Sequence, residues 1–361
     1  MQSSDKELVQ FVVAALAHHG VRQVVLSPGS RNSSFAIAFD AHPQFETLVV
    51  HDERAAAFIA LGWAQQTQTP VAICCTSGSA CLNYYPALSE AYYRNIPIVA
   101  LTADRPAKWI NQGDGQTIVQ AEVFKNHAHA YLGFDEDQFV ADPQTTAQLH
   151  AFLQILQQPW TGPIHLNIGL NEPLYGQAAF QDFKFPEISS EYPQAPLPDF
   201  SLLSGKKIMV LVGQMDPNPA LAFQLALFAK YSNVVVLVEN TSNLQHELFN
   251  ACIDRSLNGF DAADPNYQPD VLISLGGAIV SKRIKAYLRQ TPLQLHWRLA
   301  SDFPDMNTFG LLSACLPINP SLFFKEILAE DLPLNSINFQ GKWKALDYSA
   351  KDQQALFETA A

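Results

Sequence analysis

Short hydrophobic runs alternate with segments of helical periodicity along the first half of the chain. Continuous apolar runs predict strands at 23–26, 46–50, 71–75, 96–102 and 164–168. Because few polar residues interrupt most of them, they indicate parallel strands buried on both faces. Apolar residues at helical spacing predict helices at 6–18, 33–39, 53–65, 80–93 and 145–157. This alternation predicts an α/β fold with a doubly wound, mainly parallel sheet.

The pattern changes after residue 170 and then resumes. Residues 171–204 contain several prolines and no clear periodicity, which is typical of a linker. A second alternation, with strands at 206–214, 233–240 and 270–277 and helices at 220–231 and 281–288, predicts a smaller Rossmann-like domain. We therefore expect a first domain at 1–175, a linker at 176–204, a second domain at 205–330 and the start of another linker at 331–361.

Composition narrows the class of protein. A chain of 361 residues with 48% hydrophobic content can form two or three packed cores. The net charge of -12 argues against a nucleic-acid or anionic-membrane surface, which would need clustered cations. Five scattered cysteines without zinc spacing favour a reduced, cytoplasmic protein and predict no metal ligands in this chain. There is no signal-peptide pattern and no apolar run of membrane-spanning length.

Polar residues gather where the predicted strands end, and ligands of doubly wound sheets bind at carboxyl ends of strands. Asp52 and Glu53 follow one strand and open an Ala-rich helix. Either they complement the helix dipole, or Glu53 is a carboxyl group partly desolvated by its apolar neighbours and suited to sharing a proton.

Two further strand ends carry polar residues. The turn from Thr76 to Ser79 offers a hydroxyl cap, and Gly78 allows close approach of a ligand, although helix capping alone would explain the turn. Asp104 and Arg105 end the next strand, where an ordinary surface ion pair is the alternative. Several such strand ends in succession predict a ligand-binding edge.

The motifs at these strand ends resemble a known family. They read "SPGSR" (27–31), "HDERAAAFIALG" (51–62), "TSGSACLNYYPALSEA" (76–91), "LTADRP" (101–106) and "GPIHLNIGLNEPL" (162–174). In this order they resemble the pyrimidine-binding domain of thiamine-diphosphate enzymes, and most closely the 2-succinyl-5-enolpyruvyl-6-hydroxy-3-cyclohexene-1-carboxylate synthase family of menaquinone biosynthesis. "GGAIVSKRI" (276–284) resembles the middle domain of the same family.

The resemblance implies an activity and roles for individual residues. Thiamine diphosphate, with Mg²⁺, would decarboxylate 2-oxoglutarate, and the succinyl unit would be added to isochorismate. Glu53 would be catalytic, through N1′ of the aminopyrimidine, and Thr76 and Gly78 would also contact the cofactor. The substrate carboxylates would be bound by Ser30, Arg31, Arg105, Gln116, Lys282 and Arg283. For Lys282 and Arg283, an ordinary helix surface is the alternative.

The chain also departs from the family pattern. Gly115 occupies a position that is often Asn, and the Gly113-Asp114-Gly115 tripeptide imitates a metal-diphosphate motif but lacks the later Asn, so we interpret it as a local turn. We expect no counterpart here of the family's third domain, which binds the diphosphate through Mg²⁺. We therefore expect this chain to be a fragment that is inactive alone, with a partner domain on another polypeptide as the alternative, and we expect the complete protein to form a homodimer or homotetramer.

Two other functions stay open at this point. One is a different thiamine-diphosphate decarboxylase or carboligase, similar to acetohydroxyacid synthase, which would have no use for the cations Arg31, Arg105 and Lys282. The other is a non-catalytic binding protein with the same fold, for which Glu53 would be unnecessary.

Overall fold

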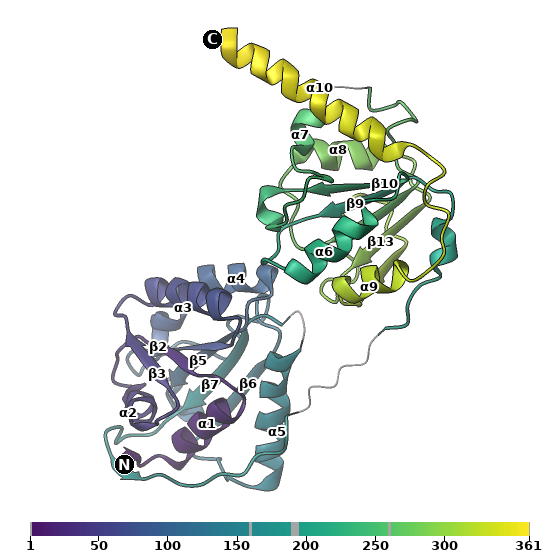
Figure 1. Cartoon of the computed structure of the whole chain (residues 1–361). Coiled ribbons are helices and arrows are strands. Elements are labelled where there is room, and N and C mark those ends of the chain that lie inside the picture. The colour runs from purple at the N-terminus through teal and green to yellow at the C-terminus, as the bar shows by residue number, and fades with distance from the viewer. Residues whose placement is uncertain (1, 159–160, 189–194, 259–260, 361) are drawn as a thin grey trace. The chain divides into compact units, whose positions relative to one another are not determined.

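The computed structural model describes residues 2–158, 161–188, 195–258 and 261–360 and divides the chain into two compact units (Figure 1). Unit 1 comprises residues 1–192, and unit 2 comprises residues 193–361. Each unit contains its own parallel sheet with helices on both faces, so each is described by itself.

Unit 1 is built on a six-stranded sheet with the order β3-β2-β4-β5-β7-β6, and all of its strands are parallel. The strands are β2 (Gln23–Leu26), β3 (Glu46–Val49), β4 (Val71–Cys75), β5 (Ile98–Asp104), β6 (Tyr131–Asp135) and β7 (Ile164–Gly169). The helices are α1 (Glu7–His18), α2 (Ser33–Ala41), α3 (Glu53–Thr67), α4 (Tyr85–Arg94) and α5 (Pro143–Gln154). The predicted doubly wound α/β fold is confirmed.

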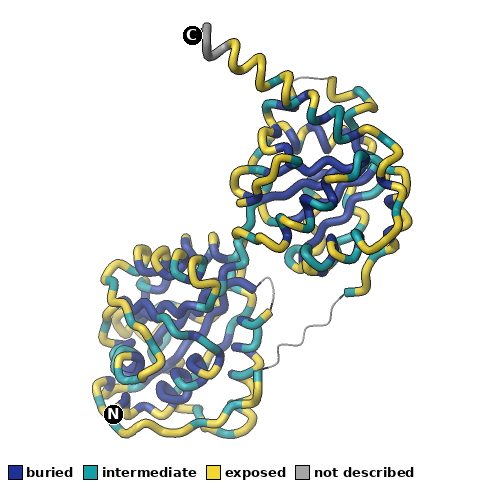
Figure 2. Tube along the Cα trace, viewed as in Figure 1, coloured by how far each residue is buried: buried dark blue, intermediate teal, exposed yellow. Residues whose placement is uncertain are grey.

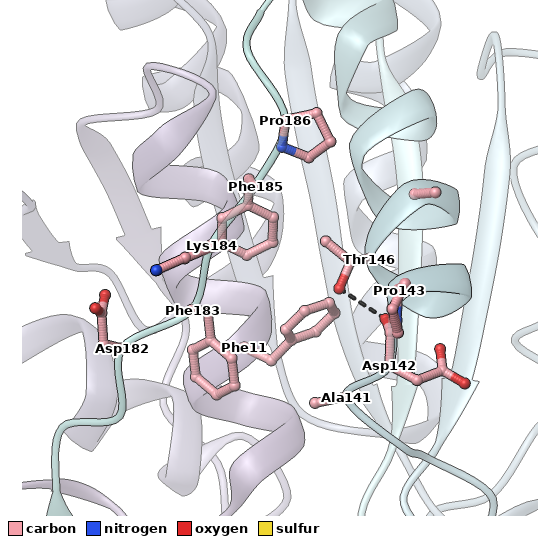
Figure 3. A pocket seen from close by; sticks show the side chains of 11 residues that line it. Phe11, Ala141, Asp142, Pro143, Thr146, Asp182, Phe183, Lys184, Phe185 and Pro186 are labelled. Atoms are coloured by element: carbon pink, nitrogen blue, oxygen red, sulfur yellow. Dashed lines mark hydrogen bonds between the residues drawn. The ribbon is translucent and has the colours of Figure 1, made fainter.

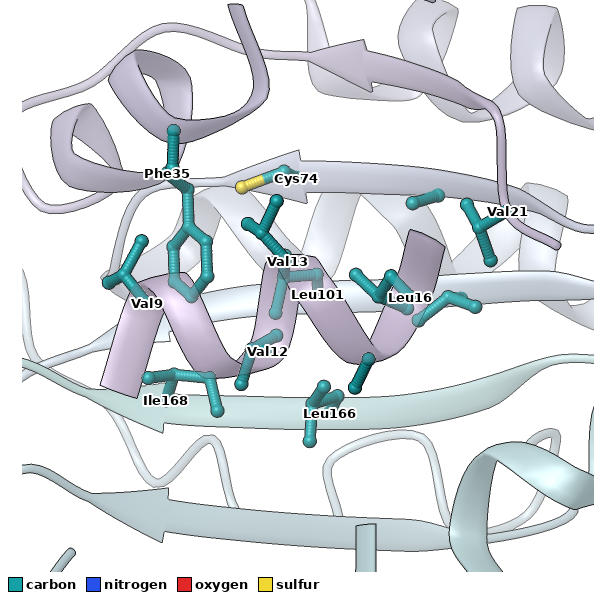
Figure 4. Packing of buried hydrophobic residues seen from close by; sticks show 14 of the residues in the cluster. Val9, Val12, Val13, Leu16, Val21, Phe35, Cys74, Leu101, Leu166 and Ile168 are labelled. Atoms are coloured by element: carbon teal, nitrogen blue, oxygen red, sulfur yellow. The ribbon is translucent and has the colours of Figure 1, made fainter. Parts of the chain in front are cut away.

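The sheet of unit 1 separates two hydrophobic cores because successive strand residues point to opposite faces. Cys74 and Leu101 pack under α1, where Val9, Val12 and Leu16 meet them (Figure 4). Helices α2 and α5 cover the same face, whereas α3 and α4 cover the other. The interior of the sheet is accordingly buried throughout its central strands (Figure 2).

Strand β3 departs from the expected burial. It lies at the edge of the sheet, where Leu48 and Val49 are 39% and 56% exposed. An apolar run does not reveal whether a strand is central or at an edge, so the prediction of burial on both faces is wrong for β3. Strand β6, which carries Gly133 at the other edge, was not predicted at all.

A small antiparallel sheet joins the start of unit 1 to the segment after its last core strand. It pairs β1 (Gln2–Ser4) with β8 (Gln177–Ala179). Strand β8 falls inside the segment that the sequence assigned to a linker at 176–204. The Gln10 amide donates to the carbonyl of Ala179 (3.1 Å), so polar contacts hold this segment on unit 1.

Unit 2 has the strand order β11-β10-β9-β12-β13-β14, again all parallel. Its strands are β9 (Ile208–Val212), β10 (Val234–Val238), β11 (Phe249–Asn250), β12 (Val271–Leu275), β13 (Leu295–Leu299) and β14 (Ala314–Leu316). Its helices are α6 (Pro219–Phe228), α7 (Ile253–Ser256), α8 (Lys282–Gln290), α9 (Pro320–Ile327) and α10 (Phe339–Ala360). This order is that of a Rossmann-like sheet, with α6 and α9 on one face.

Helix α10 differs from the linker predicted at 331–361. Phe339 and Trp343 are fully buried four residues apart and pack with Tyr287 of α8 in the second core of unit 2. The segment has few apolar residues overall, but these two lie on one helical turn and face the same way. No helix in the described residues is long and apolar enough to cross a membrane.

Candidate active site

The polar residues predicted to form a site in unit 1 lie together at the carboxyl-terminal end of its parallel strands. Because all strands of this sheet are parallel, their carboxyl ends lie at the same end of the sheet. The order β3-β2-β4-β5 places the carboxyl ends of these four strands side by side. Glu53 follows β3, Arg31 follows β2, Thr76 follows β4 and Arg105 follows β5. The fold therefore brings together residues that lie far apart in sequence.

The turn at 27–31 packs directly against the next strand end. The amide of Ser27 donates to the carbonyl of Cys74 (2.8 Å), and the amide of Arg31 donates to the Thr76 hydroxyl (3.2 Å). A Cβ atom on Gly29 would lie 2.4 Å from Cβ of Thr76, so only glycine fits between the two. Thr76 thus helps to position the turn that carries Arg31.

Arg31 is a buried cation, with only 6% of its surface exposed. Its guanidinium donates to the carbonyl of Leu170 (2.9 Å) and to the carboxylate of Glu172 (3.2 Å). Burial lowers the pKa of Arg31, and the positive charge of Arg105 lowers it further. The two guanidinium groups are therefore close enough to repel each other, and an anion between them would relieve this repulsion.

Arg105 is half-buried and already paired. Its Nε atom lies 3.0 Å from Oδ2 of Asp114 and donates to the carbonyl of Gly115 (2.9 Å). The amide of Gly115 in turn donates to Asp114 (3.1 Å). The Gly113-Asp114-Gly115 tripeptide is therefore a local turn that contacts Arg105, consistent with our interpretation of the imitated metal-diphosphate motif.

Gln116 and Ser30 are exposed at the same edge. Gln116 adopts a left-handed backbone conformation (φ 54°), and its carbonyl oxygen lies 3.0 Å from where a Cβ of Gly78 would be. Gly78 itself has φ +89°, a conformation that favours glycine. Two unusual backbone conformations thus meet beside the strand end of β4, and they keep the Gln116 segment close to Gly78.

A buried polar network supports this edge from below. Gln120 accepts from the amide of Gly78 (2.8 Å) and donates to Asn167 (2.9 Å). Asn167 donates to Asp104 (3.0 Å) and accepts from Thr102 (2.6 Å). Burial raises the pKa of Asp104, although its bonds to Asn167 and to the amide of Arg105 oppose the rise. The network joins β4, β5 and β7 into one rigid support.

Glu53 is the first residue of α3, where Asp52 caps the helix by accepting from the amide of Ala55 (2.7 Å). The helix-dipole alternative therefore describes Asp52 well. Glu53 is half-buried, and within the described residues no hydrogen bond or ion pair engages its carboxylate. Burial raises the pKa of the nearby Cys81 thiol to about 12, and the charges of Asp104 and Glu53 add to that rise.

The apolar enclosure expected around Glu53 is incomplete in unit 1. Ala56 and Ala57 are buried, but Ala55 is exposed and Phe58 is 44% exposed. Residues on the outer side of α3 face away from the core, and the local sequence does not indicate whether Glu53 lies on the inner or the outer side of the helix. The carboxylate consequently stays open to a ligand.

Lys282 and Arg283 belong to unit 2, at the start of α8. Arg283 donates to Asn258, whereas Lys282 is exposed. Both line a pocket of ≈ 650 Å³ beside the end of β10, together with Glu239 and Arg255. Glu239 accepts from the amides of Val280 (2.8 Å) and Ser281 (2.7 Å), which positions the start of α8.

Sequence reasoning missed several members of the site in unit 1. They are Asp104 as a buried carboxylate, Gln120 and Asn167 as supports, and Glu172 and Asp114 as partners of the two arginines. Their signal was present, since the motifs 101–106 and 162–174 contain Asp104, Asn167 and Glu172. The partners of Asn167 and Glu172, however, lie tens of residues away in sequence, whereas Asp114 lies in the segment that closely follows its partner Arg105.

Comparison with known proteins identifies the family. Residues 6–125 match the family described as "Thiamine pyrophosphate enzyme, N-terminal TPP binding domain". The chain is 39% identical over 335 residues to the 2-succinyl-5-enolpyruvyl-6-hydroxy-3-cyclohexene-1-carboxylate synthase of Flavobacterium psychrophilum, a match that covers 91% of this chain and 60% of that protein. The synthase of the same name from Flavobacterium johnsoniae is 40% identical over 333 residues, covering 89% of this chain and 59% of the relative.

A third synthase of that name, from Desulfotalea psychrophila, is 35% identical over 365 residues, which cover 96% of this chain and 67% of the relative. The chain thus spans about 60% of the length of the first two relatives. At 89 to 96% coverage of this chain, these similarities extend over both units. The chain belongs to the 2-succinyl-5-enolpyruvyl-6-hydroxy-3-cyclohexene-1-carboxylate synthase family of thiamine-diphosphate-dependent enzymes.

Proposed function

We propose that this chain forms part of a synthase that decarboxylates 2-oxoglutarate on thiamine diphosphate and adds the succinyl unit to isochorismate. The observation that carries the proposal is the pair of interacting cations Arg31 and Arg105, which follow β2 and β5 on either side of β4, with Glu53 after β3, the neighbour of β2. Isochorismate carries two carboxylates, which such cations bind well. An enzyme acting on pyruvate alone would not need them.

The residues present fit the pyrimidine half of thiamine diphosphate. When bound, the cofactor supplies an electron sink for the decarboxylation of a 2-oxo acid. Glu53 would hold the aminopyrimidine by sharing a proton with ring nitrogen N1′, and no other hydrogen bond within the described residues engages its carboxylate. Gly78 would allow close approach to the ring, and Thr76 would contact the cofactor beside it.

The two arginines would bind and orient the substrate. Arg31 is positioned by Leu170 and Arg105 by Gly115, so each guanidinium keeps its place while exchanging a carboxylate partner. Ser30 and Gln116 are exposed at this edge and would add hydrogen bonds to the substrate. Lys282 and Arg283, at the start of α8 in unit 2, would bind a substrate carboxylate within their own pocket.

We assign the diphosphate and Mg²⁺ to another part of the synthase. Within the described residues, the one group of at least three potential ligands consists of three histidines, and Mg²⁺ prefers oxygen ligands. The exposed Leu48, Val49 and Phe58 beside Glu53 would then be covered by a second subunit in a homodimer or homotetramer.

The experiment uses a synthase of the relatives' full length that contains this chain, with isochorismate, 2-oxoglutarate, thiamine diphosphate and Mg²⁺. Glu53→Gln keeps the shape of the side chain but removes its carboxylate, so product formation should fall by at least about 1000-fold. Glu46→Gln, an exposed carboxylate at the start of β3, serves as the control. Undiminished turnover in Glu53→Gln would refute the role of Glu53. If the unaltered synthase used pyruvate in place of 2-oxoglutarate equally well, the proposed substrate would be refuted.

A further inference from the structure

Three histidines lie close together on unit 1, at the end of the sheet where the strands begin, opposite the candidate active site. His18 ends α1, His19 follows it directly, and His150 lies in the C-terminal part of α5. Helices of a doubly wound sheet run antiparallel to the strands, so their carboxyl ends lie where the strands begin. The cluster therefore has no part in the site formed by Glu53 and Arg31.

The nitrogen atoms of the cluster have the spacing of a metal site. One ligand atom from each of the three residues lies within 4.8 Å of the other two. Nε2 of His19 is 3.2 Å from Nδ1 of His150. In a tetrahedral zinc site, Zn–N bonds of about 2.0 to 2.1 Å separate two ligand nitrogens by about 3.3 Å. The His19–His150 pair already matches one edge of such a tetrahedron.

The three rings can offer lone pairs to a cation. His19 is fully buried, and within the described residues its Nδ1 has no hydrogen-bond partner. A neutral imidazole is the form that binds metals. Within the described residues, the contact with His150 is the one hydrogen bond of the His19 ring, so its ligation would break no other.

His18 has the outer contact that is common among metal-binding histidines. Its Nε2 lies 2.8 Å from the carbonyl oxygen of Pro186, so Nε2 carries the proton and Nδ1 keeps the lone pair. Metal-binding histidines usually donate their second N–H to a carbonyl or carboxylate in this way. The side chain is exposed at the surface, which allows the small rotation that would complete the site.

The segment that carries Pro186 is held beside α1 and α5. Phe185 and Phe183 contact Phe11 of α1, with ring centroids 5.5 Å and 5.4 Å apart. The same segment and the start of α5 line a pocket of ≈ 470 Å³, to which Phe11, Phe183 and Phe185 contribute their rings (Figure 3). A metal ion at the histidines would tie together α1, α5 and this segment.

We propose that His18, His19 and His150 bind a divalent transition-metal ion of the zinc class, with a water molecule completing the coordination. Neutral imidazoles suit zinc, and a site of three histidines with one solvent position is a common zinc arrangement. The prediction of no metal ligands rested on the cysteine spacing alone, and no spacing motif links His19 to His150, which are 131 residues apart.

The test uses the full chain without a histidine tag, stripped of metal with a chelator and titrated with Zn²⁺ against a chromogenic competitor. The chain should bind a single Zn²⁺, and Co²⁺ at the same site should show the intense visible absorption of tetrahedral coordination. His18→Ala and His150→Ala should each weaken Zn²⁺ binding at least about 100-fold. His246→Ala, an exposed histidine of unit 2, should bind as the unaltered chain does.

The choice of variants keeps the outcome interpretable. His18 is exposed and His150 is partly exposed, so their loss leaves no cavity, unlike the loss of the buried His19. Circular dichroism without metal confirms that the variants are folded. Zn²⁺ should raise the unfolding temperature of the unaltered chain but not of His18→Ala. Absence of saturable Zn²⁺ binding by the unaltered chain, or binding by His18→Ala and His150→Ala as tight as that of the unaltered chain, would overturn the proposal.

Discussion

Nε of Arg105 lies 3.0 Å from Oδ2 of Asp114, so a carboxylate of the protein is paired with the guanidinium group to which we assign the binding of a substrate carboxylate. Arg31 is paired in the same way with Glu172, which is 73% exposed. Both acidic partners are more exposed than the arginines they contact. A dicarboxylate substrate must therefore displace them, and their removal should make binding easier.

Asp114→Asn should lower the apparent KM for isochorismate in the complete synthase. The Arg105–Asp114 pair is partly exposed and is worth about 0.2 to 1 kcal/mol, which corresponds to a change of about 1.4- to fivefold. Arg105→Ala should act in the opposite direction and raise the KM at least about tenfold, because it removes a charged hydrogen-bond donor. Steady-state kinetics with varied isochorismate measure both effects.

Asp137→Asn is the matched control for this prediction. Asp137 pairs with Lys108 (2.7 Å) in an exposed ion pair that contains neither candidate arginine. Its substitution should leave the KM for isochorismate unchanged. If Asp114→Asn raises that KM, Asp114 contributes to binding rather than competing with the substrate.

Gln120→Leu should destabilise unit 1 by roughly 1 to 3 kcal/mol. The buried Gln120 side chain bonds the amide of Gly78 and the side chain of Asn167, and leucine would leave the Gly78 amide without an acceptor, whereas Asn167 keeps its bond from Thr102. Amide hydrogen exchange of β4 and β5 in the full chain measures the loss. Gln112→Leu, at an exposed position, should change stability by less than about 0.5 kcal/mol. Similar stability of both variants would contradict the supporting role of the network.

Much of the sheet could be predicted from the sequence, because its central strands are continuous apolar runs. Strands β2 and β4 have the predicted bounds 23–26 and 71–75. Strand β6 was missed, since an edge strand of five residues containing Gly133 has no long apolar run. Helix α10 was missed for the opposite reason, because Phe339 and Trp343 bury their rings within an otherwise polar segment.

The candidate site was predictable only in part. Glu53, Arg31 and Arg105 follow directly from their positions after apolar strands. The carboxylates that pair with the arginines do not, because the Arg31–Glu172 contact joins residues 141 apart in sequence. Likewise, the apolar side chains next to Glu53 in sequence did not reveal that Phe58 points outward. Side-chain direction depends on how α3 packs, which the local sequence does not fix.

Gly29→Ala should destabilise unit 1 by about 1 to 3 kcal/mol, because its Cβ would collide with Thr76 at 2.4 Å. Gly62→Ala provides the comparison, since Gly62 lies inside α3 with nothing within 4 Å of the added Cβ. That change should stabilise the unit by about 0.5 to 1 kcal/mol through helix propensity. Urea unfolding of both variants measures the difference, and a harmless Gly29→Ala would show that the turn at 27–31 can shift away from Thr76.

His165 should make unit 1 less stable in mild acid. Burial lowers the pKa of His165 from 6.5 to about 3. Nε2 of the ring donates to Thr102 (2.8 Å), because the Thr102 hydroxyl itself donates to Asn167. Within the described residues, the buried Nδ1 has no partner for an added proton. The folded state therefore resists protonation throughout the range in which the unfolded chain takes up a proton.

The sign follows from proton linkage. Between pH 6.5 and about 3, the unfolded chain binds more protons at His165 than the folded chain, so the free energy of unfolding falls as the pH decreases. One such group contributes about 1.4 kcal/mol per pH unit. His165→Gln lacks the titrating group. Its free energy of unfolding, relative to that of the unaltered chain, should therefore rise by about 2 kcal/mol as the pH is lowered from 6 to 4. Hydrogen exchange of the amides of β5 and β7 reports this difference, with the exposed His51→Gln as control. Parallel pH profiles for His165→Gln and the unaltered chain would mean that the folded chain protonates His165 as readily as the unfolded chain does.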